Sequence, residues 1–307
     1  MEHSNAILSG GMVDGLKNNE LLSHDDISAF ADQILLSVAS SCPKLTGLRL
    51  QHGTVSLSPL LSLSTSCPHL TSLDIALSRH VSFHWLVFLH SLRKLAVIFY
   101  PVRVKFNPVD RAASKANFDD GELKLETLSL SGLQHYAHSF DWLWKSCLQE
   151  VELTTCIPIV DDILSKLAET CASLSSLLVD YGGSGEGLHH FITQSRFNLR
   201  KLDLELLDEL EDNHLLAVAE KFRGLLSLRL DSCYLVTGEG LKTMASAMSN
   251  KLEELALIDC NVEPGLLTTL GQRFRNLRKL DLSYNDKLVD EEFISMLASF
   301  NCLRELY

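Results

Sequence analysis

Residues 147–177 read CLQEVELTTCIPIVDDILSKLAETCASLSSL, and this stretch decides the fold. It opens with a short apolar alternation at Leu148, Val151 and Leu153, passes through a helical pattern, and returns to the same alternation at Leu174. A strand period of two and a helix period of 3.6 therefore follow each other within one short unit. Because the unit ends on the pattern with which it began, it is one complete repeat.

The strand pattern, Leu-x-x-Leu-x-Leu with conservative replacements, occurs eleven times along the chain. Its first positions are Leu45, Leu70, Leu92, Leu125, Leu148, Leu174, Leu199, Leu225, Leu252, Leu277 and Leu303. The ten intervals between them are 25, 22, 33, 23, 26, 25, 26, 27, 25 and 26 residues. Such intervals are typical of leucine-rich repeats. The sequence therefore predicts an α/β leucine-rich-repeat solenoid of about ten to eleven repeats, a curved right-handed superhelix with a parallel β-sheet on its concave face and helices on its convex face.

Each position of the repeat has a physical role. Alternation along the strand sends the fourth and sixth residues into the core and the third and fifth residues outward. The ninth position is Cys156, Cys233, Cys260 or Asn285 in four repeats, where a small side chain can turn inward beneath the bend. A helix with one apolar stripe follows, and only the neighbouring repeats can bury that stripe.

The repeat pattern also predicts the limits of the domain. Residues 1–22 are small and polar, which predicts a flexible N-terminal segment, and residues 23–307 form the repeat domain. The 33-residue interval places a long insertion at about 98–122, which we interpret either as a binding loop or as a tolerated surface insertion. The last repeat stops soon after Leu303 without a polar cap, so we expect it to be truncated and to belong to a longer parent protein.

Composition limits the partner classes. The net charge of −12 and the pI of about 5.4 argue against nucleic acid and acidic membranes, both of which favour a basic surface. The uncharged stretch between Arg49 and Asp74 is rich in serine and interrupted by glycine and proline, so we expect no membrane span. The 8 cysteines show no zinc spacing and no secretory signal is visible, which predicts reduced thiols in the cytoplasm, the nucleus or both.

No catalytic, cofactor or metal site is predicted. Residues 181–187, YGGSGEG, resemble a phosphate loop but lack its Gly-Lys-Ser/Thr ending, so we interpret them as a flexible turn. His189 and His190 have no further ligand at metal spacing. The acidic run that begins at Asp203 has no accompanying base or nucleophile motif. We therefore expect that the protein is not an enzyme.

The outward strand positions are the candidate binding residues. They are mostly charged or aromatic, and acidic side chains dominate the middle repeats, which favours a locally basic protein partner on the concave face. The candidate partner-binding residues are Glu150, Glu152, Asp180, Tyr181, Lys201, Asp203, Glu205, Arg229, Asp231, Lys279, Asp281 and Tyr284.

A more specific resemblance rests on the cysteines next to the strands. The runs Ser-Cys-Pro before Leu45 and Leu70, and the cysteines at 156 and 233 after the strands, resemble the cysteine-containing repeats of plant F-box/leucine-rich-repeat proteins. The resemblance covers roughly residues 24–307. In that family the repeats select a substrate, and an F-box of about fifty residues binds the Skp adaptor of a cullin ubiquitin ligase. No F-box pattern precedes Leu45, so the resemblance implies Skp binding only if an F-box exists in the parent protein.

The resemblance implies that this chain is the substrate-recognition part of an SCF-type ubiquitin ligase. Two alternatives stay open at this point. The chain could be an adaptor that lacks an F-box, or a receptor whose partner binding depends on a small molecule, as in related plant hormone receptors.

Overall fold

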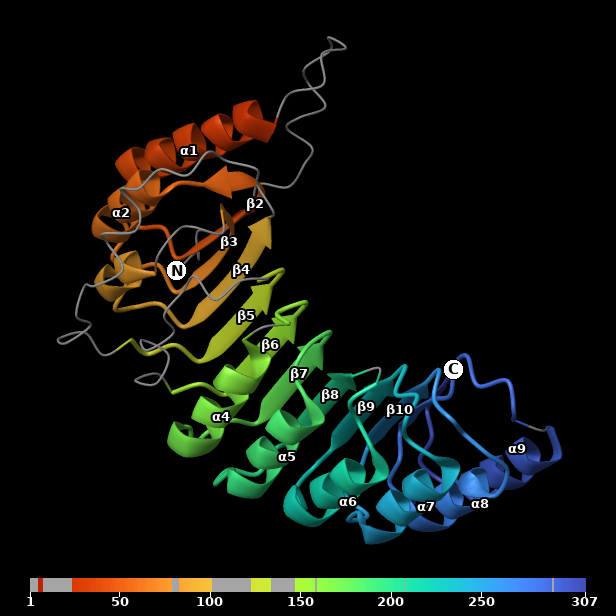
Figure 1. Cartoon of the computed structure of the whole chain (residues 1–307). Helices are drawn as coiled ribbons and strands as arrows, with labels where there is room; N and C mark the ends of the chain where they lie inside the picture. Colours follow the sequence, from red (N-terminus) through yellow and green to blue (C-terminus); the bar gives the residue numbers. More distant parts are fainter. Residues whose placement is uncertain are drawn as a thin grey trace, which may run out of the picture. The chain divides into compact units, whose positions relative to one another are not determined.

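The computed structural model describes residues 5–7, 24–78, 83–100, 123–133, 147–157, 159–206, 208–288 and 290–307 (Figure 1). Two compact units are present, Met1–Leu148 (unit 1) and Gln149–Tyr307 (unit 2), and each is described by itself. Most of the predicted N-terminal segment 1–22 lies outside the described residues, as does the predicted insertion from residue 101 to residue 122.

Unit 1 contains a parallel sheet in the order β1-β2-β3-β4-β5. Its described elements are β1 (Asn5–Ile7), α1 (His24–Ser41), β2 (Gly47–Val55), α2 (Leu57–Ser66), β3 (Ser72–Ser78), the 3₁₀ helix η2 (His84–Phe88), β4 (Lys94–Tyr100) and β5 (Thr127–Ser131). The leucine pattern does not mark β1, which pairs with the start of β2.

Unit 2 alternates strands and helices without interruption. Its elements are β6 (Glu150–Thr154), α4 (Val160–Thr170), β7 (Ser176–Asp180), α5 (Gly185–Gln194), β8 (Lys201–Glu205), α6 (Asp212–Lys221), β9 (Ser227–Asp231), α7 (Gly238–Ala247), β10 (Glu254–Ile258), α8 (Leu266–Arg273), β11 (Lys279–Asp281), α9 (Asp290–Leu297) and β12 (Glu305–Leu306). The strands are parallel and follow chain order, and the helices lie together on one face of the sheet (Figure 1). Among the described residues of this unit, no helix lies on the other face.

The strand positions that the leucine pattern predicts are confirmed. In all eleven repeats the strand begins two residues after the first leucine, as β6 begins at Glu150 after Leu148. Apart from a register shift at the end of β2, residues at the same repeat position are register partners in successive strands. One such row is buried and apolar through most of unit 2, and it consists of Val151, Leu177, Leu202, Leu228, Leu255 and Leu280. Burying each of these side chains contributes about 1.5–3 kcal/mol, so stacked repeats share one continuous core.

Successive repeats are also joined at the start of each strand by a shared carbonyl. The Ser175 oxygen, for example, accepts the N–H groups of both Arg200 (2.8 Å) and Lys201 (3.0 Å). The equivalent carbonyl of Arg200 accepts from Leu226 and Ser227 in the following repeat. The contact between two successive repeats, which we call a junction, therefore uses the same two hydrogen bonds each time. These bonds join only adjacent repeats.

Most strands of unit 2 are followed by a residue whose backbone is in the left-handed conformation. The eighth repeat position has a positive φ, between 47° and 61°, at Thr155, Tyr181, Ser232, Asp259 and Tyr284. This bend turns the ninth residue beneath the sheet, as predicted. Cys156 and Cys233 are fully buried there, and the Asn285 amide donates to the Leu257 carbonyl at 2.6 Å while it accepts the Cys260 N–H at 3.1 Å.

The glycine-rich residues 181–187 are held by a neighbouring helix. The Asp161 carboxylate of α4 accepts the Ser184 N–H (2.8 Å) and the Ser184 hydroxyl (2.7 Å), and Ser184 Oγ in turn accepts the Gly187 N–H at the start of α5. The same clamp recurs from α6 to α7, where Asp212 accepts from Thr237 and Thr237 caps Gly240. The segment is thus a helix N-cap fixed by the preceding repeat rather than a free turn.

Helix α6 begins with a cap that depends on protonation. The Glu211 N–H donates to Nδ1 of His214 at 3.0 Å, and His214 is buried at 6% exposure. Burial lowers the pKa of His214, against the opposing charges of Glu211 and Glu209, and the nearby ring of His189 lowers it further. A proton on Nδ1 removes the acceptor for the cap.

We expect the stability of the protein to fall as the pH falls through 6.5. Because the folded-state pKa of His214 lies below its unfolded value, the unfolded chain takes up the proton first. Thermal unfolding from pH 7.5 to 5.5 measures the effect. His214→Gln supplies a neutral acceptor at the same cap position, so this variant should lose visibly less melting temperature over that range. An equal loss in both proteins would contradict the assignment.

The eight cysteines divide by burial. Cys67, Cys156, Cys171, Cys233 and Cys260 are buried, while Cys42, Cys147 and Cys302 are exposed. The contact with Cys233 and burial together raise the pKa of the Cys260 thiol. The buried cysteines therefore act as small apolar side chains, as the repeat positions predict.

Candidate functional site

The candidate site is the sheet face of unit 2 that carries no helix, which we call the open face. Strands β6, β7, β9 and β10 alternate buried residues with more exposed ones, and β8 departs from this only at the buried Asp203, so the third, fifth and seventh repeat positions lie on this face. Register pairing aligns these positions into rows across neighbouring strands. The structure thus brings the predicted strand residues onto one surface: Glu150, Glu152, Asp180, Lys201, Asp203, Glu205, Arg229, Asp231, Lys279 and Asp281.

Arg229 organises the middle of the open face. Its guanidinium lies 3.2 Å from Asp203 Oδ1 on the adjacent strand and also pairs with Asp231 on its own strand. Asp203 is only 8% exposed as a result, although it lies on the predicted face. Its carboxylate therefore positions Arg229 and is hardly accessible to a partner.

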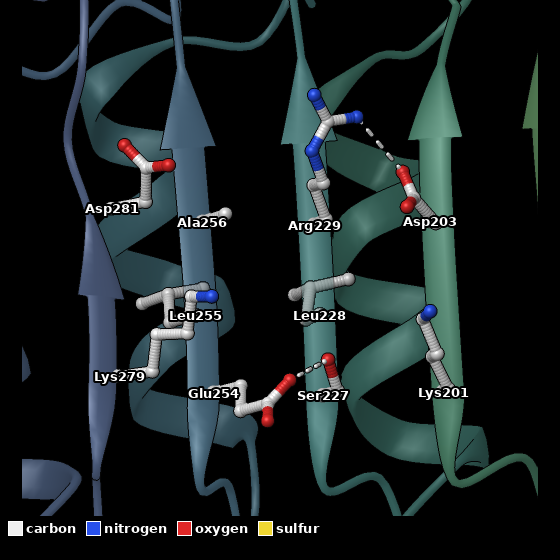
Figure 2. Close-up of a pocket in the computed structure, with 10 residues that line it drawn as sticks. All are labelled: Lys201, Asp203, Ser227, Leu228, Arg229, Glu254, Leu255, Ala256, Lys279 and Asp281. Atoms are coloured by element: carbon white, nitrogen blue, oxygen red, sulfur yellow. Dashed lines mark hydrogen bonds and ion pairs between the residues drawn. The ribbon is translucent and has the colours of Figure 1, made fainter. Parts of the chain in front are cut away.

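A shallow cavity of about 180 Å³ opens over strands β8 to β11 (Figure 2). Lys201, Glu254 and Lys279 lie toward the strand starts, and Asp203, Arg229 and Asp281 lie toward the strand ends. Its charges alternate in sign, and Ser227 donates to Glu254 within it at 3.0 Å. Pockets for small ligands are larger and mostly apolar, about 300–1,000 Å³, so this cavity is better suited to single polar side chains of a protein.

The remaining predicted charges at the C-terminal end of the open face have internal partners. Lys279 lies 3.3 Å from Glu305 and 5.3 Å from the centre of the Tyr307 ring. Asp281 accepts the N–H and the hydroxyl of Ser283. These two residues contribute more to local structure than the sequence pattern indicates.

Asp180 and Glu205 are a carboxylate pair without a cation of their own. They are register partners at the ends of β7 and β8, and neither forms an ion pair with Lys or Arg in the described part of the chain. Burial raises the pKa of Asp180, and burial followed by the charge of Asp180 raises the pKa of Glu205. Oδ1 of Asp180 is also a buried acceptor that receives no hydrogen bond. Both carboxylates would gain from a cation brought by a ligand.

Exposed tyrosines lie beyond the strand ends. The predicted residues Tyr181 and Tyr284 occupy left-handed eighth positions and are 46% and 80% exposed. A left-handed conformation costs a residue with a side chain about 1–2 kcal/mol. The same conformation recurs at Thr155, Ser232 and Asp259, so the cost belongs to the bend of the repeat, and the bend places these two rings in solvent.

Three further residues at this edge, Tyr234, Asp259 and Asp286, were not predicted from the sequence. Tyr234 is 48% exposed and donates from its hydroxyl to Asp259 Oδ2 at 2.8 Å. A hollow of about 420 Å³ is lined by Asp231, Ser232, Ile258, Asp259, Tyr284 and Asp286. The strand alternation ends before Tyr234, Asp259 and Asp286, so it gives no signal there; the repeated eighth and tenth positions would have been the signal.

Within the described ranges, no three His, Cys, Asp or Glu side chains are grouped so as to hold a metal ion. Among the helices of those ranges, none has both the length and the apolar character that a bilayer span requires.

Comparisons with known proteins identify the fold. No protein-family model matches the sequence, and no curated protein matches it. A chain in the crystal structure of the Rad7 and Elc1 complex of yeast is similar, with a TM-score of 0.60 and 18% identity over 93% of this chain and 76% of that chain. The leucine-rich-repeat-containing protein LegL7 of Legionella pneumophila is similar with a TM-score of 0.50 and 17% identity, over 89% and 86% of the two chains. The protein is therefore an α/β leucine-rich-repeat solenoid, as its sequence predicts.

Proposed function

We propose that this protein is a protein-recognition scaffold, without enzymatic activity, that selects a substrate protein for ubiquitination through the open face of unit 2. The observation that carries the proposal is the polar open face itself. Its rows of charged side chains are not needed for the apolar core, which lies on the helical side. A surface of this kind suits the charged surface of another protein.

The similar yeast chain supports a protein partner, because its structure is that of a complex between two proteins. The ubiquitin part of the proposal rests on the resemblance of the cysteine-containing repeats to F-box proteins. The pathway operates in the cytoplasm and the nucleus, where we place this protein. Binding of the Skp adaptor would require an F-box in the parent protein.

Two cavities of this unit weigh against the small-molecule receptor. The first has a volume of only about 180 Å³ and alternating charges, and the hollow of about 420 Å³ is lined mainly by carboxylates and other polar groups, which is a poor match for a mostly apolar ligand site.

Affinity capture with matched charge reversals tests the proposal. The variant Glu152→Lys/Glu205→Lys inverts two charges of the open face, on β6 and β8. The control Glu169→Lys/Glu220→Lys inverts two exposed charges on α4 and α6, on the opposite side of the same unit. We expect the face variant to lose its specific partners at least tenfold and the control to retain them, with both proteins melting within a few degrees of wild type.

The ubiquitin part has its own readout. Proteins that the wild type captures and the face variant loses should accumulate when the protein is removed from cells. Equal capture by both variants would refute recognition through the open face. Loss of capture without accumulation would refute the link to ubiquitination and leave an adaptor.

A further inference from the structure

The edge of unit 2 beyond the strand ends differs from the rest of the open face. Near the strand starts, lysines alternate with glutamates, as at Lys201, Glu254 and Lys279 (Figure 2). At the seventh to tenth repeat positions, acidic and aromatic residues gather instead. We call this edge the tyrosine rim, and it consists of Asp180, Tyr181, Glu205, Asp231, Tyr234, Asp259, Tyr284 and Asp286.

The charge of the tyrosine rim is not balanced within it. Arg229 is the cation that reaches it in the described residues, and its guanidinium is already paired with Asp203 and Asp231. Asp180 and Glu205 stand side by side with no cation between them. Their side chains hydrogen bond to each other and interact with Arg229 at longer range, but within the described residues neither forms an ion pair, so a positively charged group from outside would find two carboxylates without a direct cationic partner.

A buried oxygen of Asp180 also favours a positively charged ligand. Oδ1 of Asp180 is shielded from solvent and accepts no hydrogen bond, while it sits next to the carboxylate of Glu205. A buried acceptor without a donor is costly. Asp180 and Glu205 as a whole are only partly buried, so a lysine ammonium or an arginine guanidinium can supply the missing positive charge from the exposed side of the pair.

The exposed tyrosine rings of the tyrosine rim can also bind a cation. The rings of Tyr181, Tyr234 and Tyr284 are each about half exposed or more. An exposed tyrosine face attracts a cation that lies above it. Tyr284 and Asp259 line the same hollow of about 420 Å³, so ring and carboxylate are available to one side chain together.

We propose that the tyrosine rim binds an extended, lysine- or arginine-rich segment of a partner protein. Tyr181 follows β7 and Tyr284 follows β11, so four strand spacings of about 4.8 Å each give a rim of about 19 Å. An extended peptide rises about 3.3 Å per residue, so about six residues span it. This inference rests on the proposed function and names the chemistry and the length of the segment that is recognised.

Direct peptide binding to the purified full chain tests the inference. The probe is a fluorescein-labelled nine-residue peptide in which arginine alternates with serine, and the matched peptide carries glutamine in place of arginine. We expect saturable binding of the arginine peptide at 50 mM salt, binding at least tenfold weaker for the glutamine peptide, and marked weakening at 300 mM salt. Fluorescence anisotropy measures all three.

Variants assign the binding to the rim. Asp259→Asn/Tyr284→Asn removes one carboxylate and one ring, and asparagine tolerates the left-handed backbone at 284. We expect at least a tenfold loss of affinity, while Glu220→Gln on the exposed side of α6 binds like wild type. Unchanged binding by the double variant, or equal binding of the two peptides, overturns the proposal.

Asp180→Asn separates binding from folding. Removal of one of two adjacent carboxylates relieves repulsion, so the melting temperature of this variant should stay the same or rise while peptide affinity falls severalfold. A variant that loses no affinity counts against Asp180 in the rim. Because these experiments need neither a cellular partner nor the ubiquitin pathway, their failure is distinguishable from failure of the capture experiment.

Discussion

Replacement of Phe222 by alanine is expected to destabilise unit 2 by about 3–5 kcal/mol, the range for truncation of a buried phenylalanine. Phe222 is 1% exposed and lies at the end of α6. Its ring is stacked on Phe197 at 6.4 Å between centroids and lies 6.3 Å from Phe191. Phe191 and Phe197 belong to the preceding repeat, so the truncation opens a cavity between two repeats. Urea unfolding followed by circular dichroism measures the loss.

The matched control for this prediction is Phe222→Leu. Leucine keeps most of the volume and the apolar character of the side chain, so its cost should be clearly smaller than that of alanine. If alanine and leucine cost the same, or if alanine costs less than 1 kcal/mol, the aromatic cluster does not hold the two repeats together.

Replacement of Gly240 by alanine is expected to cost about 2 kcal/mol, although alanine normally favours a helix over glycine by about 1 kcal/mol. A methyl group at this position would overlap the Asp212 carboxylate. Asp212 would have to move and release the N–H and the hydroxyl of Thr237. Two hydrogen bonds to a charged group contribute about 3 kcal/mol at the lower end of their range, which exceeds the helix gain by about 2 kcal/mol. The clash therefore reverses the usual sign of the substitution.

A double-mutant cycle shows whether Asp212 is the cause. Asp212→Ala alone removes the clamp, and Asp212→Ala/Gly240→Ala should then be no less stable than Asp212→Ala, because the added methyl meets no carboxylate. Chemical unfolding of the four proteins gives the coupling. Additive losses would show that Gly240 is required for another reason.

The repeat sequence predicts the sheet closely because its signal is local and periodic. A leucine two residues before each strand and the alternation that follows depend only on neighbours in the chain, and all eleven predicted strands form. The clamp between Asp161 and Ser184 could not be predicted in the same way. It joins side chains 23 positions apart, and the glycines around it suggest a free turn when they are considered alone.

The sequence predicts which strand residues lie on the open face, but not which of them pair with each other. Alternation correctly assigns Asp203 and Arg229 to the open face. The ion pair between them depends on the register of β8 and β9, and it covers Asp203. Tyr234 and Asp259 were missed because they lie past the strand, in bends whose geometry follows from a positive φ that composition does not reveal.

The shared carbonyls at the strand starts imply that each unit can change its length in whole modules. From β2 to β5 in unit 1 and throughout unit 2, each junction uses the same pair of N–H groups and reaches no further than the adjacent module. Duplication or loss of one complete module would leave the same junction between the modules that become neighbours. Gene rearrangement could therefore lengthen or shorten the recognition surface by about 4.8 Å at a time. The other modules would keep their structure.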